Sequence, residues 1–333
     1  MLTAKADIRI REDRIGRYFR IYLNEFIFAG LSAGYMEKNG VADIMDGVPV
    51  PLRKADIERF RGGEGVPPLH IAGNMAWVMG ADPHFEHVPA YVAFLNRSFS
   101  GKIHEGMLDE GMDAADKGDF DKACVYFRAA LCMRPAHARG MYGYAVVCRD
   151  LYLRSGDDEY IGRFKAEALD FFELITEIRP DFAQAYYYLG YAYLNIGLYL
   201  KAELAWKSFL QRSRNQSETE EIRERLEQIA EPVMIEQGCN MAVSGRFGSG
   251  LTALEPFMET KFKEWWPLSY HLGLCYKGLG MTDEALLSFK RVLALNGSHL
   301  AAMRELADIY AAYNDAENEE KYRKKIELIN KSQ

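Results

Sequence analysis

The spacing of large and small residues between Ala183 and Leu210 predicts two antiparallel helices. With Ala183 counted as position 1, large side chains occupy positions 4, 7, 11 and 24, which are Tyr186, Leu189, Tyr193 and Trp206. Small residues occupy positions 8, 15 and 20, which are Gly190, Gly197 and Ala202. Because residues three or four apart share one face of a helix, the first three large side chains form one stripe. We expect Gly197 to open the turn and Trp206 to pack back from the second helix.

The same spacing recurs along the chain from about residue 103. Aligning Gly118 with Gly197 places Ala123 at position 20 and Phe127 at position 24. A later stretch keeps positions 7, 8, 11, 15, 20 and 24 with Leu272, Gly273, Tyr276, Gly280, Ala285 and Phe289. Another stretch matches less well, because Gly250 stands at position 20 where the others have alanine.

This spacing resembles the tetratricopeptide repeat, a helix-turn-helix unit of about 34 residues. The resemblance covers residues 103–333 and implies an all-α fold, a tetratricopeptide-repeat α-solenoid of about six helical hairpins that binds other proteins. An extra helix over 217–230 is expected to begin at a capping box, Ser217 to Glu220. The repeat units are expected near 104–137, 138–182, 183–216, 231–264, 266–299 and 300–333.

Residues 1–100 show no such period and predict a small, mainly helical unit that resembles no family known to us. One helix is favoured by the spacing of Ile15, Phe19, Tyr22, Phe26 and Ala29. Because these residues also favour strands, a hairpin of Tyr18–Leu23 with Phe26–Gly30 stays open.

The rest of the N-terminal unit is punctuated by glycine and proline. The glycines and prolines of Gly40–Pro51 predict a loop. Helical segments are expected over Arg53–Phe60, ended by Gly62–Gly65, over Leu69–Met79, and from Pro83 or Pro89 to Phe99.

The charge of the chain limits the classes of partner and compartment. The net charge is −7, and the excess of acidic residues falls after residue 100, which argues against a surface that follows nucleic-acid phosphates. Charged residues begin at Lys5, so no secretion signal is expected, and the apolar run Phe26–Ala33 is far shorter than the roughly 20 residues that span a bilayer. We therefore expect a cytoplasmic protein.

Residues capable of metal binding or catalysis are sparse. Five cysteines without CxxC spacing fall in predicted helices, where we expect reduced, buried thiols. His84 and His87 could share a helix face beside Glu86, but no third ligand is evident. The glycines of Gly62–Gly65 lack the strand and the Lys-Ser/Thr pair of a phosphate-binding loop. We expect no bound metal and no cofactor. We also expect no enzymatic activity, unless residues 1–100 form a catalytic unit.

The repeat resemblance also implies which residues face the concave groove of the superhelix, namely positions 2, 5, 9 and 12 of each unit. The partner-binding residues expected there are Leu108, Met112, Arg139, Tyr142, Val146, Arg149, Gln184, Tyr187, Tyr191, Leu194, Tyr270, Leu274 and Lys277. Tyrosines with a few basic residues suit a peptide that carries an acidic residue. The alternative is that some of these tyrosines pack against neighbouring repeats or the N-terminal unit. Leu108 and Met112 argue against the Lys/Asn clamp with which some family members hold a chaperone's C-terminal carboxylate.

The predicted function is a protein–protein interaction scaffold or adaptor that holds a peptide segment of a partner in this groove. Two alternatives stay open: a regulator that responds to a peptide, and an accessory subunit that delivers a substrate to a modifying enzyme. The balanced charge of residues 1–100 and the lack of a basic recognition helix speak against DNA binding. We expect a protein or peptide partner, neither nucleic acid nor membrane, and leave self-association open.

Overall fold

The computed structural model describes residues 5–61, 66–99 and 101–332. These residues are mainly helical, with a single two-stranded sheet among them. Two compact units divide the chain: Met1–Ala192 with Ser208–Ser213, and Tyr193–Lys207 with Arg214–Gln333. The sequence-based division into a domain of residues 1–100 and a repeat region from residue 103 stays a prediction.

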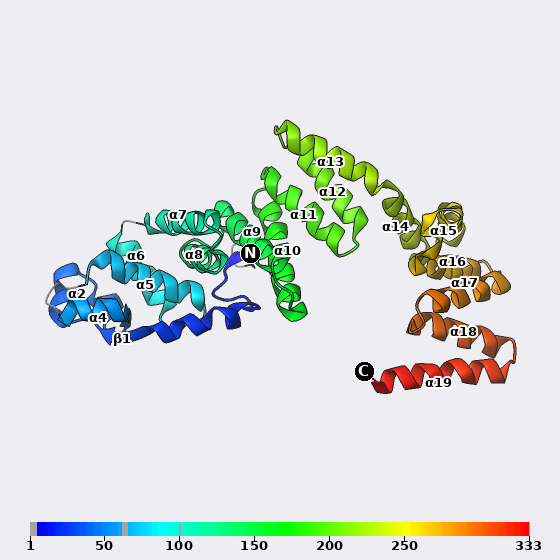
Figure 1. The fold of residues 1–333 in the computed structure, drawn as a ribbon, viewed down its shortest axis with the longest axis horizontal. Coiled ribbons are helices and arrows are strands. Elements are labelled where there is room, and N and C mark those ends of the chain that lie inside the picture. Colours follow the sequence, from blue (N-terminus) through cyan, green and yellow to red (C-terminus); the bar gives the residue numbers. More distant parts are fainter. Residues whose placement is uncertain (1–4, 62–65, 100, 333) are drawn as a thin grey trace. The chain divides into compact units, whose positions relative to one another are not determined.

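Helix pairs follow one another from residue 103 to the end of the described chain, as the solenoid prediction requires (Figure 1). The first pairs are α7 (Ile103–Asp116) with α8 (Phe120–Met133) and α9 (Ala138–Leu153) with α10 (Asp158–Ile178). They are followed along the chain by α11 (Ala183–Asn195) and α12 (Tyr199–Leu210). The later elements are α13 (Gln216–Gln228), α14 (Ala230–Val243), α15 (Phe247–Leu254), η3 (Glu255–Glu259), η4 (Lys261–Glu264), α16 (Trp266–Gly278), α17 (Thr282–Leu295), α18 (Leu300–Ala312) and α19 (Ala316–Ser332).

The turns inside these hairpins explain the glycines at position 15. Gly118, Gly197 and Gly280 have φ angles of 77°, 75° and 76°, in the left-handed region that an L side chain disfavours. In the last hairpin Asn314 takes the corresponding turn at φ 57°, which asparagine tolerates better than most residues. The spacing in the sequence therefore reflects a backbone requirement.

The single helix predicted over residues 15–29 is wrong. The segment forms two 3-10 helices, η1 (Gly16–Tyr18) and η2 (Arg20–Glu25), followed by strand β1 (Phe26–Gly30). The hairpin alternative is also wrong, because β1 pairs antiparallel with the distant β2 (Pro49–Arg53). The spacing of hydrophobic residues within one segment does not reveal that the segment pairs with a strand about 20 residues further along the chain.

The loop predicted over Gly40–Pro51 is wrong as well, because it contains α3 (Ala42–Met45) and most of β2. The prolines are tolerated because their carbonyls point away from β1: the Pro49 oxygen accepts from the Tyr91 hydroxyl at 2.7 Å, and the Pro51 oxygen from Asn74 Nδ2 at 3.1 Å. In a strand the N–H of a residue points with its carbonyl, so proline's missing N–H costs no ladder bond here.

Other N-terminal predictions agree with the structure in position. Helices α4 (Lys54–Arg61), α5 (Pro68–Ala81) and α6 (Val88–Ser98) stand where helical segments were expected, and a further helix, α2 (Ala33–Asn39), was not foreseen. Gly62–Gly65 lies outside the described residues.

The capping box predicted at Ser217 is a misassignment by two residues. Helix α13 is capped by Asn215, whose Oδ1 accepts from the backbone N–H of Ser217 at 3.1 Å and of Glu218 at 3.3 Å. Asparagine at this position satisfies the same orphan donors that a serine cap would satisfy.

The N-terminal region packs on the second helices of the first two hairpins. Helix α5 lies against α8 so closely that a Cβ on Gly80 would overlap the Val125 carbonyl (Figure 1). Upstream, Arg14 pairs with Asp170 of α10 at 2.6 Å, and the Tyr18 and Tyr160 rings lie 4.8 Å apart. This region therefore covers α8 and α10.

A buried ion pair fixes this packing. Arg128 of α8 and Asp13 form an ion pair of 2.7 Å with both side chains almost fully buried, and the guanidinium also lies over the Phe19 ring. Nearby, the Tyr144 hydroxyl donates to Glu167 at 2.9 Å, and burial raises the pKa of Glu167. Since a buried charge is costly without its partner, the N-terminal segment and the repeats stabilise each other.

The glycine that weakened one repeat match has a steric reason. A Cβ on Gly250 of α15 would lie 2.9 Å from Cys275 Sγ and 3.1 Å from the backbone nitrogen of Ala242. At the equivalent position the other repeats bury Ala123, Ala202 and Ala285 completely. Cys275 of α16 and the α14 backbone therefore leave little room for a methyl group at this position.

We therefore expect Gly250→Ala to lower the free energy of unfolding by about 1–3 kcal/mol, the usual cost of overpacking. Gly248→Ala is the matched control on the same helix, because its Cβ would meet nothing within 4 Å. That control should stabilise by about 0.5–1 kcal/mol through helix propensity. Urea titration of both variants measures the difference, and equal effects would rule out the close-approach explanation.

All five cysteines lie in helices, as expected: Cys124, Cys132, Cys148, Cys239 and Cys275. Burial raises the pKa of Cys132 and of Cys239 to about 12 and that of Cys275 to about 11. A raised pKa lowers the thiolate fraction at any pH below it, so these thiols should be weak nucleophiles.

We predict that the native protein reacts with iodoacetamide at pH 8 far more slowly than the unfolded chain. For Cys239 the thiolate fraction should fall roughly a thousandfold relative to an unperturbed cysteine. Mass spectrometry of the alkylated protein, with and without denaturant, measures this. Rapid native labelling, or near-integer zinc that is lost on Cys→Ser replacement, would contradict the expectation of inert, metal-free thiols.

Candidate functional site

The predicted groove residues divide between the two compact units. Nine lie on the first helices α7, α9 and α11 within the first unit, and we call this surface the first-helix face. Its predicted members are Leu108, Met112, Arg139, Tyr142, Val146, Arg149, Gln184, Tyr187 and Tyr191. The other four, Leu194, Tyr270, Leu274 and Lys277, lie in the second unit.

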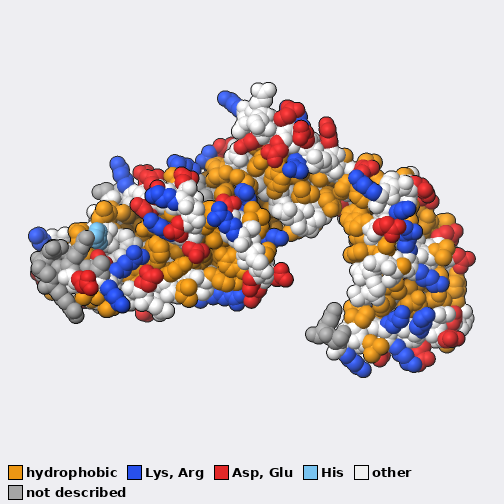
Figure 2. All heavy atoms as spheres, viewed as in Figure 1, with side chains coloured by type: hydrophobic (Ala, Val, Ile, Leu, Met, Phe, Trp, Pro, Cys, Tyr) orange, Lys and Arg blue, Asp and Glu red, His pale blue; other side chains and the backbone are white. Residues whose placement is uncertain are grey.

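Exposure separates the members of the first-helix face. Leu108 is only 6% exposed and lies beside Gly140 of α9, so it fills the space between two first helices. Met112 is 37% exposed and Arg139 is exposed, whereas the remaining members are half-buried. Figure 2 shows hydrophobic side chains gathered over α11.

Aromatic rings on the first-helix face pack against one another across the repeats. The Tyr142 ring lies 5.3 Å from Phe182 and 5.9 Å from Tyr188, and Tyr188 stacks on Phe172 at 5.4 Å. The Arg149 guanidinium lies 4.8 Å from the centre of the Tyr188 ring. Tyr188 thus joins two hairpins.

A second group of rings continues along α11. Tyr187 contacts Tyr191 edge-on at 5.2 Å, Tyr188 at 5.1 Å and Phe209 at 5.3 Å. The alternative of packing against neighbouring repeats therefore holds for these tyrosines, and each of them also keeps some exposed surface. Rings held in this way lose little freedom when another surface covers them.

A pocket of about 220 Å³ opens beside Arg139. Glu105, Leu108, Asp109 and His137 line it with Arg139, and the Arg139 head also contacts the Met112 sulfur at 3.9 Å. Burial lowers the pKa of His137, and the neighbouring His104 and Arg139 lower it further. The charges here are mixed, with two carboxylates beside the one guanidinium.

Several members of this site were missed by sequence reasoning. Tyr188 and Phe182 stand outside the positions that the repeat resemblance assigns to the groove. Glu105, Asp109 and His137 were not predicted, because polar residues are common on exposed helix faces and in connections. The run of three tyrosines, 186–188, was the one available signal for Tyr188.

The predicted groove residues of the second unit mostly pack or pair within that unit. Tyr270 lies 5.8 Å from Phe289 and 4.9 Å from His299, and Leu274 packs against the same core. Burial, with Glu305 nearby, raises the pKa of Tyr270. Lys277 forms an ion pair of 2.5 Å with Glu305. These side chains already have structural partners, while Leu194 is half-buried.

The histidine pair considered for metal binding does not share a helix face. His84 lies in a turn, where its backbone N–H donates to Asp82 Oδ1 at 3.2 Å, and His87 precedes α6 with Nε2 3.3 Å from Glu86 Oε1. The assumption of helical spacing was wrong because the segment before Val88 turns. Among the described residues, no group of three or more His, Cys, Asp or Glu side chains is placed to hold a metal ion.

Within the part of the chain that the structure describes, no helix has the length and apolar character needed to cross a membrane.

Comparison with known protein families gives two matches. Tetratricopeptide repeat models match residues 108–181, which span α7 to α10, and residues 267–299, which span α16 and α17. The first match contains α8 to α10 and most of α7, and the second contains α17 and most of α16. No curated protein sequence matches the chain significantly.

Solved structures with related folds are also found. The TPR domain of P58(IPK) aligns with a TM-score of 0.38 at 20% identity, over 68% of this chain and 60% of that one. MamA aligns at 0.29 with 21% identity over 60% and 94% of the two chains. YrrB, described as a TPR protein with an unusual peptide-binding site, aligns at 0.29 with 19% identity over 61% and 91%. The family assignment is therefore based on the two family matches and on the helix pairs.

Proposed function

Residues 108–181 and 267–299 are tetratricopeptide repeats, and we propose on this premise that the first-helix face binds a peptide segment of a partner protein. Repeats of this family are protein-interaction modules. The observation that carries the proposal is the set of partly exposed tyrosines, Tyr142, Tyr187 and Tyr191, whose rings are held by neighbouring rings.

The aromatic surface suits a peptide for physical reasons. Tyrosine buries a large area with few torsions to freeze, and its hydroxyl can bond to the backbone of a bound segment. Since the N-terminal region packs on α8 and α10, it covers the opposite helices of the first two hairpins. Both observations favour a partner on the first helices.

The proposal includes an acidic residue in the partner, recognised by Arg139. Arg139 is exposed, and within residues 5–61, 66–99 and 101–332 no carboxylate lies within ion-pairing distance of it. Arg149, by contrast, already lies 3.5 Å from Asp150. Arg139 is therefore the better cation for a partner's carboxylate.

We expect Arg139→Ala to weaken partner binding by about 1 kcal/mol at low salt, and the loss to shrink at high salt because screening weakens exposed charge pairs. Calorimetry with a protein that co-purifies from the native host, identified by mass spectrometry, measures this. Arg97→Ala removes another exposed arginine, which pairs with Asp43 on the N-terminal surface, and is the control. An Arg139→Ala loss that does not depend on salt would exclude the acidic contact.

The same proposal makes the protein a non-catalytic, cytoplasmic adaptor that acts on neither nucleic acid nor membrane. The net charge of −7 supports a protein partner over nucleic acid or an anionic membrane, because both of these would repel an acidic protein.

A further inference from the structure

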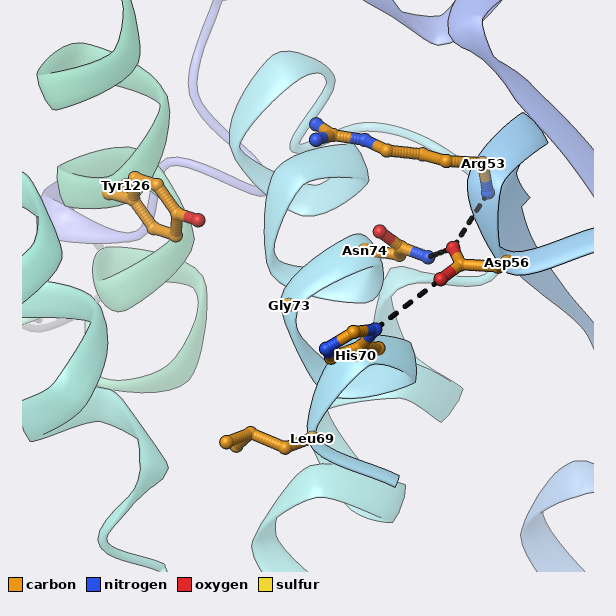
Figure 3. A pocket seen from close by; sticks show the side chains of 7 residues that line it. All are labelled: Arg53, Asp56, Leu69, His70, Gly73, Asn74 and Tyr126. Carbon is orange, nitrogen blue, oxygen red and sulfur yellow. Dashed lines mark hydrogen bonds and ion pairs between the residues drawn. The ribbon is translucent and has the colours of Figure 1, made fainter. Parts of the chain in front are cut away.

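A second cavity lies away from the first-helix face, between the N-terminal region and α8. Its volume is about 290 Å³, near the lower limit for small-molecule sites. Figure 3 shows side chains from three directions around it: Arg53 and Asp56 near β2 and α4, His70 and Asn74 on α5, and Tyr126 on α8.

Arg53 gives the cavity a cationic end. Its guanidinium carbon lies near two rings, 5.1 Å from the Phe26 centroid and 4.9 Å from the Trp77 centroid. Its Nε is buried without a hydrogen-bond partner, and in the described chain no carboxylate lies within ion-pairing distance of it. A guanidinium beside aromatic rings can still donate to a carboxylate through its N–H groups.

The carboxylate that lines this cavity, Asp56, cannot serve as that anion. Asp56 is buried and accepts from Asn74 Nδ2 at 2.7 Å and from the backbone N–H of Arg53 at 2.9 Å, and its Oδ1 lies 3.5 Å from His70 Nδ1. Burial opposes ionisation, but these hydrogen bonds hold the pKa of Asp56 below its usual value. Asp56 therefore organises the floor of the cavity and orients the His70 ring (Figure 3).

The remaining wall is apolar and open. The Tyr126 ring stands on α8 with its hydroxyl toward Asn74 (Figure 3), and Leu69, which also lines the cavity, is 64% exposed. Gly73 of α5 leaves space opposite Tyr126, since a Cβ there would meet nothing within 4 Å. A flat apolar group fits between these two residues.

We propose that this cavity binds a small organic carboxylate, whose carboxylate group pairs with Arg53 and whose apolar part lies between Tyr126 and Gly73. This site is independent of the peptide-binding face, because it is built on α5 and α8. It would make the protein responsive to a small metabolite-sized acid in addition to its protein partner.

The test uses benzoate as the probe and benzamide as its neutral counterpart of the same shape. Proton–nitrogen correlation spectra of the full chain follow the Trp77 indole N–H, which is buried without a hydrogen-bond partner beside Arg53. Benzoate should shift this signal saturably, with at least about tenfold higher affinity than benzamide, the factor that corresponds to one charged contact. Equal affinity for both probes, or saturable binding of inorganic phosphate without binding of benzoate, would overturn the proposal.

Two variants test the geometry. Gly73→Leu should fill the cavity and lower benzoate affinity at least about tenfold without loss of the fold, because leucine is the better helix former and its Cβ is unobstructed. Gly162→Leu on α10, equally unobstructed, should leave affinity unchanged. Arg53→Gln should lower benzoate affinity and spare benzamide. Arg97→Gln, which changes an exposed arginine that pairs with Asp43, is its control. A folded Gly73→Leu protein that binds benzoate normally would refute the site.

Discussion

Trp206→Ala should lower the free energy of unfolding by about 3–5 kcal/mol, the usual cost of removing a large buried aromatic side chain. Trp206 is 0% exposed in α12, at the position where the spacing requires the large residue of the second helix. Because alanine cannot fill the space of an indole, a cavity would remain. Thermal and urea unfolding would measure the loss.

Leu204→Ala is the matched control for this experiment. It removes a large side chain from the same helix, but Leu204 is 61% exposed, so little change is expected. Since repeat arrays depend on interfaces between neighbours, the Trp206→Ala loss should spread to adjoining hairpins and be visible by hydrogen exchange there. Unchanged melting would show that the repeat phase is wrong.

Tyr187→Ala combined with Tyr191→Ala should weaken partner binding by several kcal/mol, because interface tyrosines at hot spots cost about 2 kcal/mol or more each. Both rings are half-buried and touch each other at 5.2 Å, so the pair offers one continuous aromatic surface. The loss of folding stability should be smaller than for Trp206→Ala. Calorimetric affinity and a melting curve on the same sample separate the two effects.

The contrasting pair lies on the same helix. Tyr193 is buried, and Tyr186 lies under the Arg212 guanidinium at 4.7 Å, so Tyr186→Ala with Tyr193→Ala should act mainly on stability. If the Tyr187 and Tyr191 variant binds normally while changes at Tyr18 or Phe26 abolish binding without unfolding, the partner site lies on the N-terminal region.

The repeats could be predicted because their rules are local. Each turn needs a residue that tolerates positive φ, as Gly118 and Gly197 show, and each hairpin needs a small residue such as Ala202 where its helices cross. Both requirements recur at fixed spacing, so one sequence reveals them. Gly250 departs from the pattern for a reason that is visible only when Cys275 and Ala242 are placed in space.

The N-terminal region could not be predicted in the same way. β1 is a strand because it pairs with β2. β2 tolerates its prolines because their carbonyls point away from β1, where the Tyr91 hydroxyl and Asn74 Nδ2 donate hydrogen bonds to them. The aromatic residues near Phe26 suit a helix or a strand equally well. Contacts distant in sequence decided between the two, and periodicity carries no information about them.

The candidate site shows the same division. The resemblance selected Tyr142, Tyr187 and Tyr191, which the structure leaves partly exposed. It also selected Leu108, which is buried between α7 and α9. Tyr188 was missed because its contacts depend on how one hairpin packs on the next. The groove assignment as a whole stays a prediction for binding experiments.

The most direct test of the first-helix face is photo-crosslinking to the co-purifying partner. A benzophenone amino acid replaces Met112, which is 37% exposed on α7, or Ile21, which is 61% exposed on the N-terminal segment. Binding in the proposed place predicts that the partner is captured from position 112 and not from position 21. Capture from position 21 alone, by a protein that is folded and binds normally, would contradict the proposal.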